Sequence, residues 1–323
     1  MGSGILEWVV VCMVVVMPTC RAQLRSDFYN KTCSAALQTL RDEVRKAMDD
    51  DKTIGAALIR LHYLDCFVNG CDGSILLDDT PQVKGEKNAI YNKDSARGFE
   101  VIDNIKDAVN KVCTRNSMSC ADILAVAARD AILISGGPWY DPLLGRRDTK
   151  VVSLAAANDP KNLPPPNSSL STLISVFQNH GMGIKELVLL SAAHTVGNAR
   201  CVSFRQRIYT DAFINPFFAA RLRDNCPQSG GDNNVEPLDH QTPYSFDNVY
   251  FNNLETSTAL LHSDQVLYSG DFSKLSDQLV KNYSANHEAF LRDFPAAMIN
   301  MGNFKPLITA SQGEIRTNCR KIN

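Results

Sequence analysis

The sequence predicts a mostly α-helical protein with two lobes around a site between them. Apolar residues recur at helical spacing along most of the chain, long strand-type alternation is missing, and the connections are long. The 323 residues are 44% hydrophobic and 21% charged, which suffices to bury a large core in one or two domains. With 33 basic and 35 acidic side chains, the net charge of −2 gives no field that would attract nucleic acid or an anionic membrane.

The first 22 residues have the features of a secretory signal peptide. An apolar run from Val9 to Met17 precedes a short polar stretch that ends at Ala22, a small residue suited to cleavage before Gln23. The segment before this run contains Glu7 and no basic residue, which is atypical of a signal peptide, so a membrane anchor is the alternative. The run is, however, shorter than the ~20 residues that span a bilayer. We expect cleavage, no remaining membrane segment, and one exported domain formed by residues 23–323.

The exported part of the chain contains an even number of cysteines. Cys12 and Cys20 would leave with the signal peptide. The cysteines that remain are Cys33, Cys66, Cys71, Cys113, Cys120, Cys201, Cys226 and Cys319. An exported chain with an even count favours disulfides over free thiols or zinc, although the count alone does not assign the pairs. Sequons at Asn30, Asn167 and Asn282 agree with export and predict a glycosylated surface.

Residues 54–66 form the first well-marked helix. Ile54, Leu58, Leu61 and Asp65 share one face of it by their spacing. Arg60 and Leu64 are four positions apart on another face, with Tyr63 beside them. Taken without context, Arg60 would be expected to pair with a surface acid.

A second helix is predicted to begin after Ser119. The segment Ser119–Asp122 could form a capping box, and Gly136-Gly137-Pro138 would end the helix. The apolar residues that share its buried face are Ile123, Val126, Ala127 and Ala131. The proline-rich stretch from about Ser153 to Ser169 is predicted to be a loop.

His194 stands out among the six histidines. It follows the apolar run Leu187–Leu190 and is preceded by the small residues Ser191, Ala192 and Ala193, which leave room for something flat. A buried, hydrogen-bonded core histidine is the alternative. The residues alone do not decide between a ligand and a core side chain.

Seven segments, in order along the chain, resemble those of the class III (secretory) plant haem peroxidases. They are Arg60–Ser74, Asn92–Phe99, Met118–Asp122, Leu144–Asp148, Leu190–Thr195, Phe246–Asn248 and Ser263–Gln265. The resemblance extends over residues 23–323. It implies the two-lobed haem-peroxidase fold, with haem b between a distal and a proximal helix.

The resemblance also implies roles for residues around the haem. His194 matches the proximal ligand of the iron, and Asp264 matches the carboxylate that accepts its other N–H and makes the imidazole more electron-donating. Arg60 matches the distal arginine that stabilises charge as the O–O bond breaks. Asn92 matches the residue that hydrogen-bonds the distal base, and Ser95 a residue that contacts the haem.

Two calcium sites are implied by the same resemblance. The distal site would use Asp65, Val68, Gly70, Asp72 and Ser74, with Glu86 linked through water. The proximal site would use Thr195, Asp239, Thr242 and Asp247. Several oxygens with two or three carboxylates suit a hard cation, although the same acids could simply cap helices or face water.

The resemblance further assigns the cysteines, the reductant and the setting. The implied disulfides are Cys33–Cys113, Cys66–Cys71, Cys120–Cys319 and Cys201–Cys226. Pro164 falls beside the exposed haem edge at which small phenolic reductants would bind, although it could be an ordinary loop proline. We expect a monomer that is secreted to the extracellular space or cell wall, or that resides in a vacuole.

The chain departs from the family pattern at Leu64. The family has His-Phe-His-Asp-Cys where this chain has His62-Tyr63-Leu64-Asp65-Cys66, so an alkyl group replaces the distal general base and acid. Tyr63 is a poor base because a phenol has a pKa of about 10, and His62 should face away from the haem. The other histidines, His180, His240, His262 and His287, match no functional position. Smaller departures at Tyr140–Pro142 and Ser203 bear on the choice of reductant.

Two functions therefore remain open from the sequence. The first is a haem-dependent oxidoreductase that uses hydrogen peroxide to oxidise small phenolic donors, with impaired or specialised activity. The second is a secreted protein that binds haem and calcium without useful turnover. Leu64 is the only residue that suggests this second function. One base separates histidine from leucine codons, so a sequencing change is a third explanation of Leu64, which the genomic codon would decide.

Overall fold

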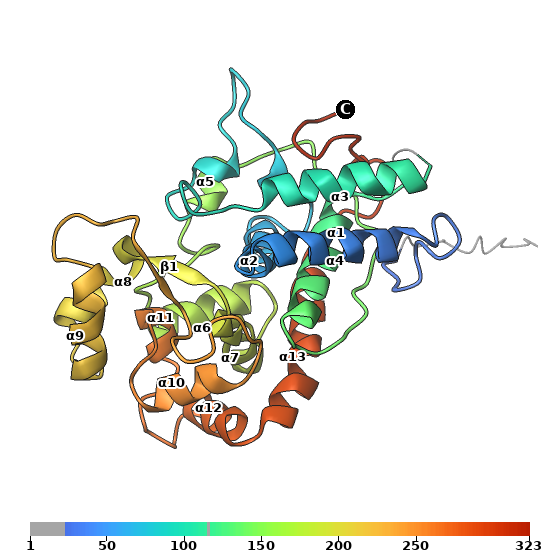
Figure 1. The fold of residues 1–323 in the computed structure, drawn as a ribbon. Coiled ribbons are helices and arrows are strands. Elements are labelled where there is room, and N and C mark those ends of the chain that lie inside the picture. Colours follow the sequence, from blue (N-terminus) through green and yellow to red (C-terminus); the bar gives the residue numbers. More distant parts are fainter. Residues whose placement is uncertain (1–22, 115–116) are drawn as a thin grey trace, which may run out of the picture.

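The computed structural model describes residues 23–114 and 117–323, which form a mostly α-helical fold of two lobes (Figure 1). The predicted signal peptide, residues 1–22, lies outside the described residues. The α-helices are α1 (Ala36–Asp50), α2 (Ile54–Phe67), α3 (Phe99–Val112), α4 (Cys120–Ile134), α5 (Leu154–Ala157), α6 (Leu170–Asn179), α7 (Ile184–Ser191), α8 (Cys201–Thr210), α9 (Pro216–Asn225), α10 (Val249–Glu255), α11 (His262–Gln265), α12 (Leu275–Ala285) and α13 (His287–Gly302). The 3₁₀ helices are η1 (Ser74–Leu76), η2 (Glu86–Asn88) and η3 (Ala192–Thr195), and β1 (Asn198–Arg200) pairs antiparallel with β2 (Val235–Pro237).

The first lobe is built around α4, which packs against α1, α2 and α3 (Figure 1). Every residue of α4 from Cys120 to Ile132 is buried. Its many alanines let the neighbouring helices approach closely, and the closest association is with α2. The helix that the resemblance places on the distal side is therefore held along one face by a rigid partner.

The second lobe packs α7 against α6, α12 and α13, and α10 against α12 and η3. Helix α13 also contacts α2, so it connects the two lobes. Helices α8 and α9 form a small separate core with Leu260 and Leu261, to which the disulfide Cys201–Cys226 belongs. In this lobe η3, which carries His194, lies against α7 and α10.

The C-terminal segment returns to the first lobe. Arg316 is fully buried there and donates hydrogen bonds to the backbone oxygens of Gly73 (2.8 Å) and Thr149 (2.7 Å). Cys319 is bonded to Cys120 at the start of α4. The first lobe is thus completed by the last residues of the chain.

The described residues contain four disulfides, Cys33–Cys113, Cys66–Cys71, Cys120–Cys319 and Cys201–Cys226, which are the pairs that the resemblance implies. The sequon residues Asn30, Asn167 and Asn282 are all exposed, as glycosylation would require. Within residues 23–114 and 117–323, no helix is both long enough and apolar enough to cross a bilayer.

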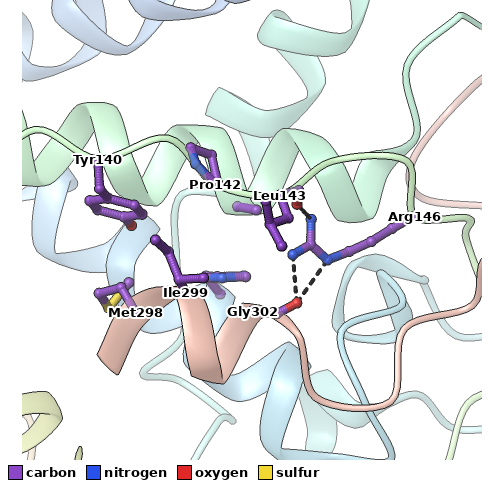
Figure 2. A pocket seen from close by; sticks show the side chains of 9 residues that line it. Tyr140, Pro142, Leu143, Arg146, Met298, Ile299 and Gly302 are labelled. Atoms are coloured by element: carbon purple, nitrogen blue, oxygen red, sulfur yellow. Dashed lines mark hydrogen bonds between the residues drawn. The ribbon is translucent and has the colours of Figure 1, made fainter. Parts of the chain in front are cut away.

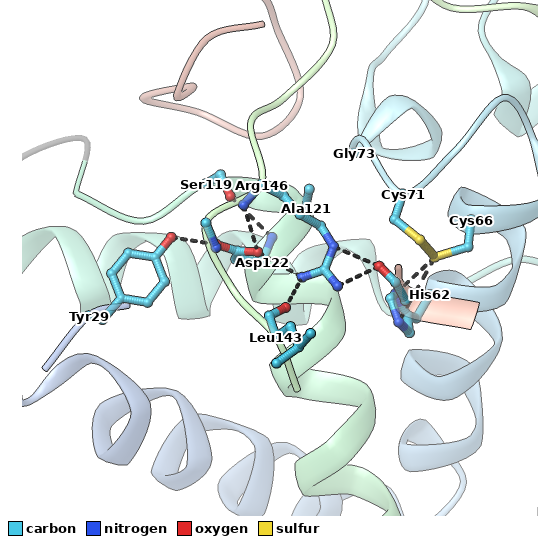
Figure 3. A network of polar contacts seen from close by, with 12 residues as sticks. Tyr29, His62, Cys66, Cys71, Gly73, Ser119, Ala121, Asp122, Leu143 and Arg146 are labelled. Atoms are coloured by element: carbon cyan, nitrogen blue, oxygen red, sulfur yellow. Dashed lines mark hydrogen bonds and ion pairs between the residues drawn. A yellow bond between two sulfur atoms is a disulfide. The ribbon is translucent and has the colours of Figure 1, made fainter. Parts of the chain in front are cut away.

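A buried ion pair between Asp122 and Arg146 joins α4 to the end of α13 (Figure 3). Arg146 Nη1 donates to Asp122 at 2.9 Å, and its Nε and Nη2 donate to the Gly302 carbonyl at 3.0 and 2.5 Å. The Tyr29 hydroxyl donates to the other Asp122 oxygen at 2.6 Å. Tyr29, Asp122, Arg146 and Gly302 thus form a buried polar clamp, which holds the N-terminal segment, α4 and α13 together.

His62 on α2 lies beside this clamp and lines a cavity of about 10 Å³ with Tyr140, Arg146 and Gly302 (Figure 2). The cavity has room for about one water. Burial, together with the nearby charge of Arg146, lowers the pKa of His62 to about 3, so the imidazole stays neutral. His62 contacts the Cys66 sulfur at 3.6 Å. It is a packing residue, in agreement with the sequence prediction.

Several local predictions can be compared with the structure. The helix predicted at 54–66 is confirmed as α2, and α4 begins after Ser119 and ends before Gly136, whose φ of +96° requires the left-handed region. The capping box was half right: Ser119 Oγ accepts from the Asp122 amide at 3.2 Å, but the Asp122 carboxylate binds Arg146 and Tyr29 instead of returning to Ser119. The predicted loop at 153–169 is wrong at α5, a single helical turn that the Ser153 side chain caps.

Candidate active site

Arg60 lies on the inner face of α2 and holds the loop opposite. Its Nη1 donates to Ser95 Oγ and its Nη2 to the Tyr91 carbonyl, both at 2.6 Å. Burial lowers the pKa of the guanidinium, yet the side chain remains partly accessible. It forms no ion pair with any described residue, so the alternative of a surface ion pair is wrong.

His194 on η3 is paired with Asp264 on α11. Its Nδ1–H donates to Asp264 Oδ1 at 2.9 Å, and Oδ2 is 3.1 Å away. Burial lowers the pKa of His194, but the charge of Asp264 and this hydrogen bond raise it by more, so the net shift is upward. Since Asp264 holds the proton on Nδ1, the lone pair of Nε2 is free to act as a ligand.

Arg60 and His194 lie near each other in the fold. The His194 side chain is 39% accessible, so its ring is not closed off by packing side chains. The charge of Arg60 also lowers the pKa of His194, so the two side chains lie within electrostatic reach of each other. A free imidazole nitrogen from the second lobe and a guanidinium from the first are donor groups suited to a haem between α2 and η3.

Leu64 is buried, 3% exposed, and packs in the main hydrophobic core. Asn92, in the loop that Arg60 holds, is 1% exposed. Its Nδ2 donates to the Glu86 carbonyl at 3.0 Å, but its Oδ1 is buried without a hydrogen-bond partner in the described part of the chain. Such an orphaned acceptor costs about 1–3 kcal/mol, which an N–H donor at this position would relieve.

Tyr63 is the other polar side chain on this part of α2. Its ring packs against Phe67, with ring centroids 4.4 Å apart. Burial raises the pKa of the phenol, and the charge of Arg60 only partly offsets this. The hydroxyl therefore keeps its proton near neutral pH and can donate a hydrogen bond but not act as a base.

The residues implied for a distal calcium site lie together behind α2. Asp65 Oδ2 accepts from the Gly73 amide at 3.0 Å, whereas its Oδ1 is buried and unpartnered within the described residues. Ser74 Oγ donates to Glu86 at 3.0 Å. Burial and the charge of Asp72 raise the pKa of Asp65, and burial raises the pKa of Asp72 to about 6 and of Glu86 to about 8. A cation placed among these crowded carboxylates would relieve the repulsion.

The residues implied for the proximal site also converge. Thr242 Oγ1 lies 3.3 Å from Asp239 and 3.1 Å from Asp247, and Thr195 Oγ1 lies 3.4 Å from Asp247. In the segments that the structure describes, no three His, Cys, Asp or Glu side chains form a metal cluster by themselves. Both oxygen clusters would thus need hydroxyl or backbone oxygens, as calcium readily accepts.

Pro164 is half-buried in the loop before α6, and Ser203 is half-buried on α8. His180 is buried between the carbonyls of Val176 (2.7 Å) and Phe67 (3.0 Å), which makes it a packing residue. His287 is exposed.

Two contacts at the site were not anticipated from the sequence. The Tyr250 hydroxyl donates to Asp264 Oδ1 at 3.0 Å, and the charge of Arg200 on β1 acts on Arg60. Tyr250 follows the segment Phe246–Asn248 in the sequence, but no spacing rule connects it to Asp264. Arg200 follows His194 by six residues, and only the fold brings it back toward Arg60.

Comparison with known proteins yields a consistent result. A family model described as "Peroxidase" matches residues 40–286. The chain is 52% identical to "Peroxidase RIP1" of Medicago truncatula over 319 residues, which cover 98% of this chain and 97% of that relative. It is 50% identical to "Peroxidase 4" of Vitis vinifera over the full length of both. It is also 49% identical to "Peroxidase P7" of Brassica rapa subsp. rapa, over 93% of this chain and all of that relative.

Proposed function

Since this chain belongs to the class III plant peroxidases, which are oxidoreductases that use hydrogen peroxide, we propose that it oxidises small phenolic donors with haem b, at a rate limited by Leu64. The observation that carries the proposal is the pairing of His194 with Asp264 opposite Arg60. The mostly helical fold and the peroxidase relatives support it. The missing distal base sets its limit.

When bound, haem supplies the redox-active iron at which peroxide is reduced and phenols are oxidised by single electrons. His194 Nε2 would hold the iron, while Asp264 fixes the imidazole and increases its electron donation through Nδ1. Arg60 would stabilise negative charge as the O–O bond breaks, because its partly buried guanidinium is fixed by Ser95 and Tyr91.

Proton transfer is the step that this chain performs poorly. A peroxidase must take a proton from one peroxide oxygen and deliver it to the other. Leu64 can do neither, Tyr63 keeps its own proton, and His62 is buried beside Arg146. Water would have to carry the proton, which should slow the reaction by about 10²–10⁴, or about 3–5.5 kcal/mol of barrier.

Two calcium ions are proposed as structural cofactors. Supporting the distal site are the unpartnered Asp65 Oδ1 and the raised pKa values of Asp65, Asp72 and Glu86. The oxygens implied for this site are those of Asp65, Val68, Gly70, Asp72 and Ser74, with Glu86 through water. Supporting the proximal site is the convergence of Thr195, Asp239, Thr242 and Asp247.

We also propose a reductant site at Pro164, export after cleavage of residues 1–22, and a monomer in the extracellular space, cell wall or vacuole. The exposed sequons and four disulfides are compatible with export.

The alternative is a secreted protein that binds haem and calcium without useful turnover. One observation favours this alternative: the buried oxygen of Asn92 receives no donor from the described residues, and Leu64 has no donor to offer. Stopped-flow mixing of the holoprotein with hydrogen peroxide, followed at the haem Soret band, separates the two. A saturable spectral change that phenols reverse supports the enzyme, whereas a spectrum that only bleaches supports the binding protein.

A further inference from the structure

Tyr250 and His194 converge on one oxygen of Asp264. The Tyr250 hydroxyl donates to Asp264 Oδ1 at 3.0 Å, and His194 Nδ1 donates to the same atom at 2.9 Å. We propose that Tyr250 is a positioning residue that limits the negative charge which Asp264 offers to His194, and thereby raises the reduction potential of haem bound there. The inference rests on the proposed function, because it requires haem on His194.

The three groups come from three elements that pack together. Tyr250 lies on α10, which contacts η3, the element of His194, while Asp264 lies on α11. Tyr250 and Asp264 are both 3% exposed, so solvent does not compete for their hydrogen bond. The ring of Tyr250 packs edge-on against Phe251, with centroids 5.2 Å apart. The phenol is therefore held as a permanent donor.

The protonation of Tyr250 is equally fixed. Burial, followed by the charge of Asp264, raises the pKa of the phenol well above its ordinary value. Among the described residues, only Tyr250 and His194 donate to the Asp264 side chain. The carboxylate charge is thus shared between two donors.

Sharing this charge has a predictable electronic effect. A buried hydrogen bond polarises its acceptor strongly, so the Tyr250 O–H draws density away from Oδ1. His194 then gains less imidazolate character and donates less to the iron, which favours the reduced state. Without the Tyr250 hydroxyl, Asp264 would interact with His194 alone, and the oxidised iron would be favoured.

The test is a spectroscopic redox titration of the Tyr250→Phe holoprotein. This change keeps the ring and removes only the donor. We expect haem to be retained and the preference for ferric over ferrous iron to rise about three- to tenfold, where tenfold corresponds to about 59 mV for one electron. If the phenylalanine variant fails to fold, Tyr250→Met replaces it, because methionine also lacks a donor and adapts to irregular gaps. Its reduction potential must fall by the same amount.

Tyr283→Phe provides a matched control. Tyr283 is also buried, donates to a carboxylate (Asp293, 3.0 Å) and packs against Phe251 at 5.5 Å, but it does not contact Asp264. Its removal should leave the potential unchanged. In an Asp264→Asn background, the effect of Tyr250→Phe on the potential should vanish, since the shared acceptor is altered.

The outcomes separate the inference from the proposed function. An unchanged potential in Tyr250→Phe, while Asp264→Asn alone shifts it, overturns the role of Tyr250 only. An equal shift in Tyr283→Phe also overturns it, because the effect would then reflect general loosening. Failure of the wild-type protein to retain haem through His194 would instead refute the proposed function.

Discussion

The side-chain nitrogen of Asn92 donates a hydrogen bond to the backbone carbonyl of Glu86. The amide oxygen of Asn92 is buried and receives no hydrogen bond from the described residues. A histidine at position 64 would supply that donor. Leu64→His should raise the rate of peroxide-driven haem oxidation by about 10²–10⁴, measured by stopped flow at the Soret band. Histidine and leucine have similar bulk, so the free energy of unfolding should change by less than about 1.5 kcal/mol.

Leu64→Met is the control for this experiment, because it retains an apolar side chain of similar size. Its rate should stay near that of the wild type. If Leu64→His gains less than tenfold with haem bound, then Leu64 is not the limiting defect, and the binding-protein function becomes the better one.

His194→Ala should abolish tight retention of haem, because only His194 combines an accessible ring with a buried carboxylate partner. Haem content per protein, measured after gel filtration, checks this. His180→Ala is the control. It removes a buried imidazole that lies between the carbonyls of Val176 and Phe67, so it should lower the stability of the protein but leave its haem content unchanged. Equal haem content in His194→Ala and the wild type would rule out His194 as the ligand.

Removal of calcium should destabilise the first lobe. Chelation leaves the buried carboxylates of Asp65, Asp72 and Glu86 to repel each other directly behind α2. We expect a lower melting temperature, a shifted haem spectrum, and a stability loss of about 3–4 kcal/mol if calcium was present at several hundred times its dissociation constant. Re-addition of calcium should restore both signals. Melting curves that are indifferent to the chelator would contradict both proposed sites.

The buried Lys106 predicts a pH dependence of stability. Its Nζ donates to the Met118 carbonyl at 2.5 Å, and burial lowers its pKa to about 8, with Asp148 acting in the opposite direction. Since the unfolded chain then binds more protons between pH 8 and about 10.5, this residue adds stability as the pH rises through that window. The difference in unfolding free energy between wild type and Lys106→Met should rise by up to about 3 kcal/mol from pH 7.5 to 10.5.

Denaturant titrations at several pH values measure that difference. Lys111→Met, on the same helix but exposed, should show no such rise. If the unfolding free energies of Lys106→Met and the wild type differ by the same amount at every pH, then the charge on Lys106 does not destabilise the folded protein.

The elements that the sequence predicted well are those with strong local signals. Helix α2 is mostly apolar and buried on most of its surface, and α4 has a serine cap at one end and a glycine pair at the other. His194 was singled out as a candidate ligand, which stays a prediction, because small residues precede it and the surrounding segment resembles a family pattern. Leu64 was identified because it breaks that pattern.

The features that were missed depend on long-range contacts. Asp122 was expected to complete a capping box, but its carboxylate instead binds Arg146, Tyr29 and the Gly145 amide, which are distant in the sequence. Tyr250 and Asp264 meet only because the fold packs α10 against η3 and brings Asp264 of α11 to His194. Helix α5 escaped prediction because four residues are too few for a periodic signal.

The return of the C-terminal segment to the first lobe constrains how the protein can be synthesised. The disulfide partner of Cys120, Cys319, is synthesised 199 residues later. At a translation rate of roughly 5–20 residues per second, this interval lasts about 10–40 s. During that interval the thiol of Cys120 is open to wrong partners, and the cavity that Arg316 fills beside Gly73 and Thr149 is vacant. The first lobe therefore reaches its final packing only after Arg316 and Cys319 have been made, and a chain that ends before Cys319 would keep an unpaired Cys120 for quality control to recognise.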